Sequence, residues 1–512
     1  MLRTPSGIGI AHLFDHAIAQ HPRKIALIDD HCSLSFAEVD TRADRLAGAI
    51  VGSGGRPGDR VALILPNSCA FVVSEVAALR AGMVKVPLNI RFHVEEVLYA
   101  LADCEPTVLI CDEVYSSAVL ARKSEVPSLR AVFTVGRPVE GALHWDKVVS
   151  NGPAERLRAP FNPDSPVLIR YTGGTTGRPK GIVHTEASLI AIALDSIRET
   201  GIVDSDVALH LGHLSHGMNF MWPAFFAAGA TQVIREGFEP KAVLTDFARH
   251  GVTFVYMVPT MIQRLMREDD GSADVSSLRL FLYASAPMPV PLLRQAMARY
   301  GDIFCQVYTL SEAPVITTIM RPHEHVERET DVGSRLGSCG RPVLTMELKL
   351  VDEAGRIVRQ GDVGEIAVRS VNNMASYWRL PEETTSTLVD GWLMTGDLAR
   401  EDEDGFLHLV DRKKDIIITG ALNVYPKEVE DVLYRHAGVA LCAVVAVPDE
   451  EWGEAVKAFV VPKPGVRIEA AELIELCRNH LASYKKPRHL EFVESLPLSP
   501  IGKVMRRALR GR

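Results

Sequence analysis

The chain has 512 residues, of which 47% are hydrophobic and 23% are charged, close to the average for globular proteins. A single hydrophobic core stops growing at roughly 250–300 residues, so we expect at least two domains. The formal net charge of -8 is small for this length and the lysines and arginines are scattered, which argues against a nucleic-acid-binding surface.

The N-terminal segment does not have the pattern of a signal peptide. His12, Asp15 and His16 interrupt the stretch that would have to form an apolar core. No uncharged run along the chain approaches the ~18 residues that a membrane helix needs. The eight cysteines are spread singly, without a CxxC pair or histidines at zinc spacing. We therefore expect a cytoplasmic protein with reduced thiols and no transmembrane segment.

Apolar, strand-like runs alternate with helical patterns through about residue 350. The strand-like runs include RVALILP (60–66), VKVPL (84–88), TVLICD (107–112), TFVYMVP (253–259) and DIFCQVY (302–308). Helical patterns over 71–82, 94–104, 242–251 and 293–301 separate or precede them. This alternation predicts the α/β class, with doubly wound, mostly parallel sheets in a large N-terminal domain.

The pattern changes from about residue 340 to short alternating strands. MELKLVD (346–352), GEIAVRS (364–370) and FLHLVD (406–411) are separated by turn signals and predict a β-rich subdomain. After the charged stretch DRKKD, a helix is expected to start near Pro426. We place the boundary between an N-terminal domain, 1–411, and a small α+β C-terminal domain, 412–512, at this charged stretch.

The stretch YTGGTTGRPKG (171–181) joins an apolar strand to an amphipathic helix. The helix is expected to begin near Glu186 and to place Ile190, Leu194 and Ile197 on one face. In the loop, glycines let the backbone approach an anion, while hydroxyls and cations add donors and charge. These residues are Thr172, Gly173, Gly174, Thr175, Thr176, Gly177, Arg178 and Lys180. The loop therefore predicts a phosphate-binding site, although Pro179 distinguishes it from a Walker A loop.

This loop closely resembles the phosphate loop of the adenylate-forming superfamily, which includes acyl-CoA synthetases, firefly-type luciferases and the adenylation domains of peptide synthetases. Further motifs that resemble those of the superfamily follow in order. They are YTLSEA (308–313), WLMTGDLA (392–399), DRKKD (411–415), ITGALNVYPKEVE (418–430) and LPLSPIGKVMRRALR (496–510). The resemblance extends from near residue 10 to the end of the chain.

The resemblance implies a nucleotide site with magnesium. Tyr308 would stack on adenine, Asp397 would accept hydrogen bonds from both ribose hydroxyls, and Arg412 would contact the ribose. Thr309 and Ser311 belong to the same nucleotide-binding motif as Tyr308. Glu312 and Thr176 would hold Mg²⁺, a hard cation that prefers oxygen ligands.

The resemblance also implies roles in the C-terminal domain. Lys503 would reach the acyl carboxylate and the α-phosphate of ATP, and would act in catalysis together with Lys180 and Glu312. Lys414 would be the pivot about which the small domain moves. Gly420 and Asn423 would face the pantetheine channel of coenzyme A.

The segment HLSHGMN (213–219) resembles the segment that lines the acyl pocket in the superfamily. His216, Gly217 and Met218 would line the pocket there, and Ala284, Ser285 and Ala286 are also expected in the substrate pocket. The neighbouring Phe220, Met221 and Trp222 are apolar, which favours an apolar fatty or aromatic acid over a dicarboxylate.

The implied reaction has two steps. A carboxylic acid and ATP form an acyl-adenylate with release of pyrophosphate, and the thiol of coenzyme A then takes the acyl group and releases AMP. Two alternatives stay open on the sequence: transfer of the acyl group to a carrier protein, and a catalytically inactive nucleotide-binding protein. ATP, Mg²⁺, coenzyme A and a small carboxylic acid are the expected ligands, and a homodimer is possible.

Overall fold

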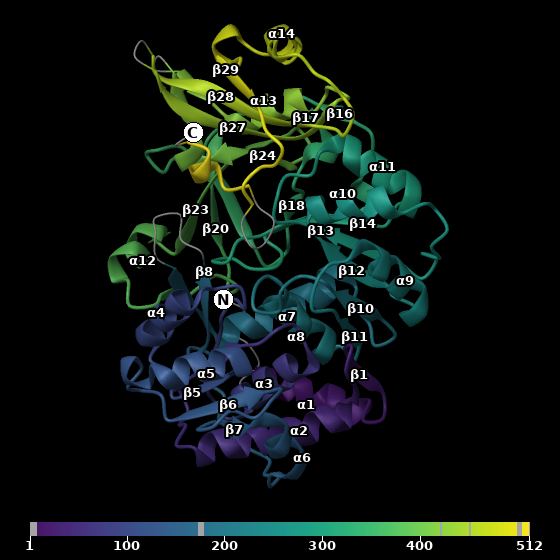
Figure 1. Cartoon of the computed structure of the whole chain (residues 1–512). Helices are drawn as coiled ribbons and strands as arrows, with labels where there is room; N and C mark the ends of the chain where they lie inside the picture. The colour runs from purple at the N-terminus through teal and green to yellow at the C-terminus, as the bar shows by residue number, and fades with distance from the viewer. Residues whose placement is uncertain (1–7, 173–178, 420–421, 450–451, 499–503, 511–512) are drawn as a thin grey trace.

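Two large sheets, both mostly parallel, form the body of the chain (Figure 1). The computed structural model describes residues 8–172, 179–419, 422–449, 452–498 and 504–510. In the eight-stranded sheet the order is β21 (Ser376–Tyr377), β9 (Lys180–Thr185), β8 (Pro166–Thr172), β4 (Val84–Pro87), β3 (Arg60–Ile64), β5 (Val108–Asp112), β6 (Ala131–Val135) and β7 (Leu143–His144). The strands from β8 to β7 are parallel, as predicted, and β9 and β21 extend one edge in antiparallel fashion.

The second sheet has nine strands. Their order is β18 (Arg341–Pro342), β15 (Thr318–Met320), β14 (Phe304–Tyr308), β13 (Leu280–Tyr283), β12 (Phe254–Met257), β10 (Val207–His210), β11 (Thr231–Ile234), β1 (Ile25–Ile28) and β2 (Ser33–Ser35). The six strands from β14 to β1 are parallel. The carboxyl ends of β13 and β14 therefore lie side by side, which brings the segments after Tyr283 and Tyr308 together.

Helices cover both faces of each sheet. A central layer packs between the two sheets and consists of α1 (Ile10–Gln20), α2 (Phe36–Gly52), α3 (Cys69–Arg80), α7 (Glu186–Thr200) and α8 (Met218–Ala227). The outer face of the eight-stranded sheet carries α4 (Val94–Cys104) and α5 (Glu113–Ala121), and that of the nine-stranded sheet carries α9 (Pro240–His250), α10 (Pro259–Glu268) and α11 (Val290–Tyr300). The short α6 (Trp145–Asn151) packs on α2.

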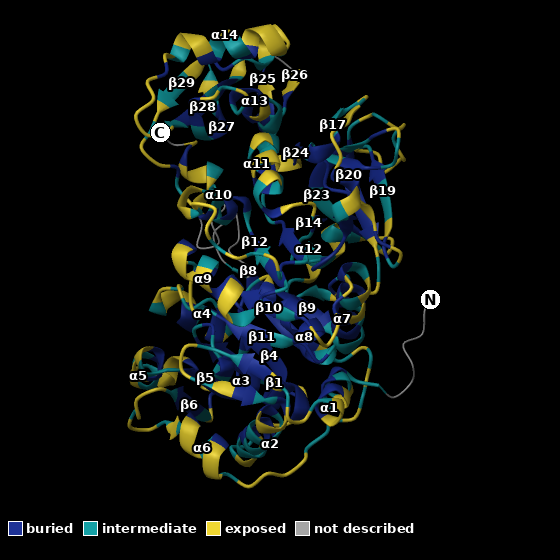
Figure 2. Cartoon of the chain, turned by 90° about the vertical axis from the view of Figure 1, so that its right-hand side faces the viewer, coloured by how far each residue is buried: buried dark blue, intermediate teal, exposed yellow. Residues whose placement is uncertain are grey.

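The inner strands of the two large sheets are buried on both faces (Figure 2), whereas edge strands such as β7 and β18 are partly or fully exposed. In β3, Val61 and Leu63 belong to the central core, while Ala62 and Ile64 belong to the outer core under α4 and α5. This explains why such strands are continuous apolar runs in the sequence. Within the described residues, no helix combines the length and the apolar composition that crossing a membrane requires.

A smaller antiparallel sheet follows the body, at the position where short alternating strands were predicted. It contains β19 (Glu347–Val351), β20 (Gly364–Arg369), β22 (Leu388–Val389), β23 (Trp392–Glu401) and β24 (Leu407–Arg412), with α12 (Pro381–Thr387) and the hairpin of β16 (Glu329–Thr330) and β17 (Gly333–Ser334) nearby in the chain. Its apolar face joins the central core through Ile366, Leu393 and Leu407.

The last part of the chain forms an α+β unit at the top of Figure 1. Its sheet contains β25 (Ile417–Thr419), β26 (Leu422–Val424), β27 (Val439–Asp449), β28 (Gly453–Pro462) and β29 (His489–Phe492), and its helices are α13 (Pro426–Leu433) and α14 (Ala470–His480). Its apolar cores contain no described residue before Ile417, whereas the central core ends at Leu409. This separation supports the boundary at residue 412, which stays a proposal.

Helix α7 begins at Glu186, as predicted, but its buried face differs from the prediction. The Thr185 side chain accepts a hydrogen bond from the Ser188 N–H and caps the helix at its N-terminus. Leu194 was expected on the buried face, yet it is 47% exposed. Leu189 and Ala193 are buried instead, because α7 packs between the sheets and against α8. The spacing of the apolar residues alone does not indicate which side of the helix these neighbours cover.

Candidate active site

A cavity of about 2110 Å³ lies where the body, the β-rich subdomain and the C-terminal unit meet. It opens beyond the carboxyl ends of β13 and β14, the position where parallel sheets bind ligands. Its lining includes most of the predicted site residues that the structure describes. These are Lys180, His216, Gly217, Met218, Ser285, Ala286, Tyr308, Thr309, Ser311, Glu312, Asp397, Arg412 and Lys414.

One wall of the cavity holds the three residues predicted to contact the nucleoside. The Tyr308 hydroxyl donates to Asp397 Oδ2 at 2.7 Å, and Arg412 Nε lies 3.1 Å from Asp397 Oδ1. Strand pairing explains this geometry, because Asp397 on β23 lies directly opposite Arg412 on β24. Burial raises the pKa of Tyr308, and the neighbouring Asp397 carboxylate raises it further, so Tyr308 stays a hydrogen-bond donor at neutral pH.

The loop that carries Glu312 is fixed from three sides. His184 Nε2 lies 2.9 Å from the Ser311 carbonyl oxygen, and the Met374 N–H donates to the Glu312 carbonyl oxygen at 2.7 Å. The Tyr377 hydroxyl donates to Glu312 Oε1 at 2.8 Å. Burial lowers the pKa of His184 to about 4, so its ring is neutral and Nε2–H is the donor to Ser311.

Lys180 contacts Tyr377, the residue that donates to Glu312. Its Nζ is 5.5 Å from the centroid of the Tyr377 ring and 3.8 Å from Glu383 Oε1. Tyr377 reaches this position because β21 pairs with β9, the strand that begins with Lys180. Neither His184 nor Tyr377 was predicted from the sequence as a site residue, since each contacts the loop of Ser311 and Glu312 from a distant segment of the chain.

Glu312 has the chemistry expected of a magnesium ligand. Its carboxylate is only partly buried, lines the cavity, and provides the hard oxygen donors that Mg²⁺ prefers. Only Oε1 has a hydrogen bond from a described residue, the bond from Tyr377. Thr176, the second predicted ligand, lies outside the described residues.

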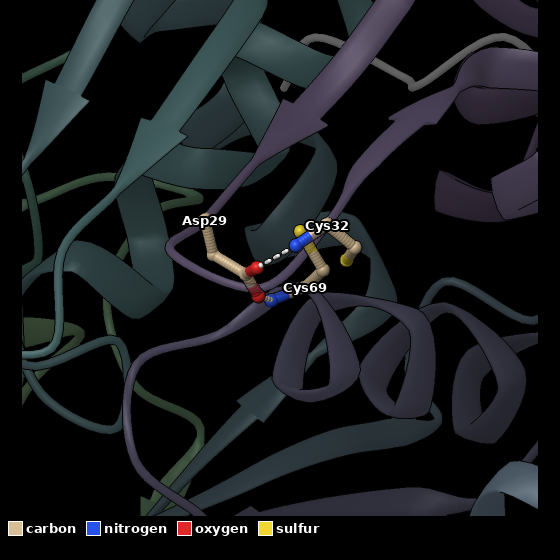
Figure 3. A group of neighbouring side chains, drawn as sticks. All are labelled: Asp29, Cys32 and Cys69. Atoms are coloured by element: carbon tan, nitrogen blue, oxygen red, sulfur yellow. Dashed lines mark hydrogen bonds between the residues drawn. The ribbon is translucent and has the colours of Figure 1, made fainter.

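A different group of possible metal ligands lies away from the cavity, at the start of α3. Asp29, Cys32 and Cys69 place one ligand atom each within 4.8 Å of one another, the one such group among the described residues (Figure 3). The Asp29 carboxylate, however, already accepts backbone hydrogen bonds from His31, Cys32 and Cys69. Two thiols and an occupied carboxylate do not suit Mg²⁺, so this group is not the predicted magnesium site.

Another part of the cavity lining is apolar. Met218, Phe220 and Met221 at the start of α8 line it. Trp222 was expected to belong to this wall, but it is fully buried in the core and does not line the cavity. Its Nε1–H donates to Glu75 Oε2 at 2.7 Å, on the face of α8 that packs against α3. Ala284 is likewise buried in the core and is not part of the lining, in contrast to Ser285 and Ala286.

Two residues of the cavity wall have strained backbone conformations. Ser285 has a φ of 74° and Val315 a φ of 71°, values that are uncommon for residues other than glycine, and for a β-branched residue such as Val315 genuinely rare. Such residues cost about 1–3 kcal/mol each and cluster at functional sites. Ser285 is held by a 2.6 Å hydrogen bond between its Oγ and the Tyr256 hydroxyl.

Arg170 lines the same cavity and was not singled out from the sequence. It lies on β8 and is 3% exposed. Its Nη2 donates to His216 Nδ1 at 2.6 Å, because a guanidinium offers only donors, and its Cζ lies 5.2 Å from the centroid of the Phe220 ring. The one sequence signal was the presence of an arginine within the otherwise apolar run SPVLIRY.

Lys414 lies in the short 3₁₀ turn after β24. Burial of its ammonium group lowers its pKa, and the Arg412 charge lowers it further. Nearby, the Arg506 guanidinium contacts Asp411 Oδ1 at 3.1 Å and both oxygens of Glu430 at 2.9 Å. These ion pairs fix the segment 504–510 of the C-terminal unit beside the proposed hinge.

The structure does not test most of the remaining predicted residues. Gly173, Gly174, Thr175, Thr176, Gly177, Gly420 and Lys503 lie outside the described residues, and of Thr172 only the backbone pairing with Lys180 is described. Asn423 lies on β26, is exposed, and is not part of the cavity lining. The roles assigned to these residues stay predictions.

Comparison with known proteins identifies the family. The model of the AMP-binding enzyme family matches residues 14–378, and that of the AMP-binding enzyme C-terminal domain matches residues 428–503. A feruloyl-CoA synthase of Amycolatopsis sp is 37% identical over 495 residues, which cover 96% of each chain. A medium/long-chain-fatty-acid–CoA ligase of Mycobacterium tuberculosis is 35% identical over an alignment of 529 residues, which covers 100% of this chain and 91% of the relative.

Solved structures agree with this assignment. An anthranilate CoA ligase in complex with anthranoyl-AMP superposes with a TM-score of 0.91, at 28% identity, over 99% of this chain and 98% of that chain. ATP-bound MatB from Rhodopseudomonas palustris superposes with a TM-score of 0.90, at 30% identity, over 98% of this chain and 99% of that chain. The chain therefore belongs to the AMP-binding enzyme family of adenylate-forming proteins and is an acid–thiol ligase that forms the carbon–sulfur bond of an acyl-CoA.

Proposed function

We propose that this ligase activates an apolar carboxylic acid, fatty or aromatic, as an acyl-adenylate and then transfers the acyl group to coenzyme A. In the first step a carboxylate oxygen forms a bond to the α-phosphorus of ATP, and the bond to the β-phosphate oxygen breaks with release of pyrophosphate. In the second step the thiol sulfur bonds to the acyl carbon, AMP leaves, and the thiol proton is lost to the surroundings.

The observation that carries this proposal is the division of one cavity into a polar and an apolar part. Tyr308, Asp397 and Arg412 form a hydrogen-bonded group suited to a nucleoside, with Lys180 and Glu312 nearby. Met218, Phe220 and Met221 offer apolar surface to an acyl group. A bound Mg²⁺ on Glu312 would supply positive charge to the phosphates, where negative charge builds up in the reaction.

The substrate preference follows from the described wall. Three large apolar side chains favour a fatty or aromatic group, although a difference of one methylene is worth only about 1–3 kcal/mol in such a pocket. The second step, in this proposal, follows a rotation of the C-terminal unit about Lys414 that carries Lys503 away and admits the thiol. The separate apolar cores on either side of residue 412 support such a motion.

The experiment is exchange of labelled pyrophosphate into ATP across a panel of fatty, aromatic and dicarboxylic acids, followed by thioester formation with the best acids. We expect exchange with apolar acids and little with dicarboxylates, and thioester formation with coenzyme A. The thiol acceptor is tested by offering coenzyme A and a phosphopantetheinylated carrier protein in parallel. If the enzyme exchanges pyrophosphate and acylates the carrier protein but forms no coenzyme A thioester, the acyl acceptor is a carrier protein and the coenzyme A part of the proposal is wrong.

A further inference from the structure

The described residues contain four buried cationic side chains, and Arg170 differs from the other three. Arg80 contacts Asp15, Asp40 and Asp44, Lys85 contacts Glu75, and Arg335 contacts Asp402 and Asp404. No carboxylate oxygen of a described residue lies within 4.0 Å of the Arg170 guanidinium. Arg170 is therefore the one buried cation of the described chain that has no carboxylate partner.

The hydrogen bonds of Arg170 leave most of its donors unused. Its one hydrogen bond to a described residue is that from Nη2 to His216, and Nε is buried without a partner. Burial lowers the pKa of Arg170 to about 10, which still leaves the group charged at neutral pH. A buried, unpaired charge costs several kcal/mol, so the fold carries this cost at a residue that lines the cavity.

Arg170 lies where the two parts of the cavity meet. On one side it contacts His216 and Phe220, which line the part of the cavity proposed to hold the acyl group. Glu312 lines the same cavity, and its carboxylate raises the pKa of Arg170, which opposes the larger lowering effect of burial. An acid whose apolar part lies on α8 and whose reacting end faces the phosphates would thus bring its carboxylate to Arg170.

We propose, on the basis of the proposed function, that Arg170 binds the reacting carboxylate of the acid substrate. The guanidinium donates to one carboxylate oxygen, and the other oxygen attacks the α-phosphorus while pyrophosphate leaves. Arg170 neither gains nor loses a proton. Its positive charge offsets the repulsion between the carboxylate and the triphosphate, and His216, which accepts from Nη2, orients the guanidinium.

The test compares the wild type with Arg170→Met and Arg170→Lys by pyrophosphate exchange. Octanoate, benzoate, ferulate and malonate are the acids, and Arg356→Met is the matched control, because Arg356 is exposed and lies outside the cavity lining. We expect Arg170→Met to raise the KM for every acid on the order of 10- to 100-fold, the effect of losing a charge-assisted hydrogen bond. The KM for ATP should stay within about twofold, and Arg170→Lys should recover part of the loss.

Two further measurements separate this role from a structural one. Thioester formation from a supplied acyl-adenylate should be unchanged in Arg170→Met, because an acyl-adenylate has no free carboxylate. In the absence of acid, Arg170→Met should be at least as thermally stable as the wild type, since it removes an unpaired buried charge. A merely structural role predicts a lower melting temperature and equal losses in both half-reactions.

Several outcomes would overturn the assignment. An unchanged acid KM in folded Arg170→Met would do so, and so would a rise confined to malonate, which would mean that Arg170 contacts a second group on the acid. An equal rise in the KM for ATP would place Arg170 on the nucleotide. If the wild type itself shows no exchange with any acid, the proposed function fails first, and this failure is distinguishable from that of the Arg170 role.

Discussion

Replacing Glu75 with glutamine is expected to destabilise the fold strongly, although Glu75 is not a site residue. The Glu75 carboxylate is fully buried in the central layer and accepts from Lys85 Nζ at 2.9 Å, Asn219 Nδ2 at 2.6 Å and Trp222 Nε1 at 2.7 Å. Lys85 Nζ also donates to Asn219 Oδ1 at 3.0 Å. This network joins α3 and β4 to α8, which carries the apolar wall of the cavity.

The magnitude follows from the number of donors. A glutamine amide has one acceptor oxygen, so its NH₂ group must face either the Asn219 amide or the Lys85 and Trp222 donors. Lys85 also loses its buried counter-charge. Breaking a buried ion pair in this way costs about 3–5 kcal/mol. We expect the melting temperature, measured by differential scanning fluorimetry at one scan rate, to fall on the order of 5 °C.

The matched control is Glu347→Gln, which removes the carboxylate of the exposed pair with Arg369. Exposed pairs contribute little to stability because water and salt screen them, so the melting temperature of this control should barely change. Exchanging Glu75→Leu and Lys85→Met together should recover the part of the loss that comes from the unpaired charge. The remaining loss should persist, because the buried Asn219 and Trp222 side chains still lack their partners. If the melting temperature of Glu75→Gln equals that of the control, the reasoning that the network depends on the Glu75 charge is wrong.

Three other predictions concern pH and the site. Burial lowers the pKa of His184, His210 and His325 to about 4 each, below the value of about 6.5 in the unfolded chain. The unfolded state therefore binds more protons between pH 6.5 and 4, and stability should fall on acidification by up to about 1.4 kcal/mol per pH unit for each histidine. The melting temperature of His210→Asn should depend less on pH over this range than that of the wild type. An unchanged dependence would contradict the lowered pKa of His210. Tyr377→Phe removes the donor to Glu312 and should lower kcat/KM for magnesium ATP about 10-fold in pyrophosphate exchange, with an unchanged melting temperature; a normal value would show that Tyr377 does not position Glu312. Lys503→Ala should reduce adenylate formation by a hundredfold or more, roughly the effect of losing an aimed donor, while leaving thioester formation from supplied acyl-adenylate largely intact. Near-normal pyrophosphate release by that variant would refute the role of Lys503.

Much of the fold could be predicted from local patterns. The runs that became β3, β4 and β5 are apolar because these strands are buried on both faces, and the helices between them show their own periodicity. The start of α7 could be placed at Glu186, after the capping Thr185. Leu194 and Trp222 were assigned wrongly, because spacing along a helix does not tell which neighbour covers which face.

Site residues that belong to a sequence motif could be predicted. Site residues that reach the cavity only through contacts between distant segments could not. Tyr308, Asp397 and Arg412 stand in recognisable motifs, and the structure brings them within hydrogen-bond distance. Tyr377 and His184 reach the Glu312 loop only through strand pairing and the carbonyl of Ser311. Arg170 stands out because it is buried and has no carboxylate partner among the residues that the structure describes, and no local sequence pattern indicates this.

The formation of an acyl-adenylate is tested most directly by following oxygen. The reaction is run with magnesium ATP, coenzyme A and an apolar acid that carries ¹⁸O in both carboxylate positions. Mass spectrometry then determines how many ¹⁸O atoms each product contains. Attack of the carboxylate on the α-phosphorus predicts AMP with one ¹⁸O atom, acyl-CoA with one, and unlabelled pyrophosphate. Unlabelled AMP, or ADP with labelled phosphate, would contradict the account, because the acid would then not have been joined to the α-phosphate.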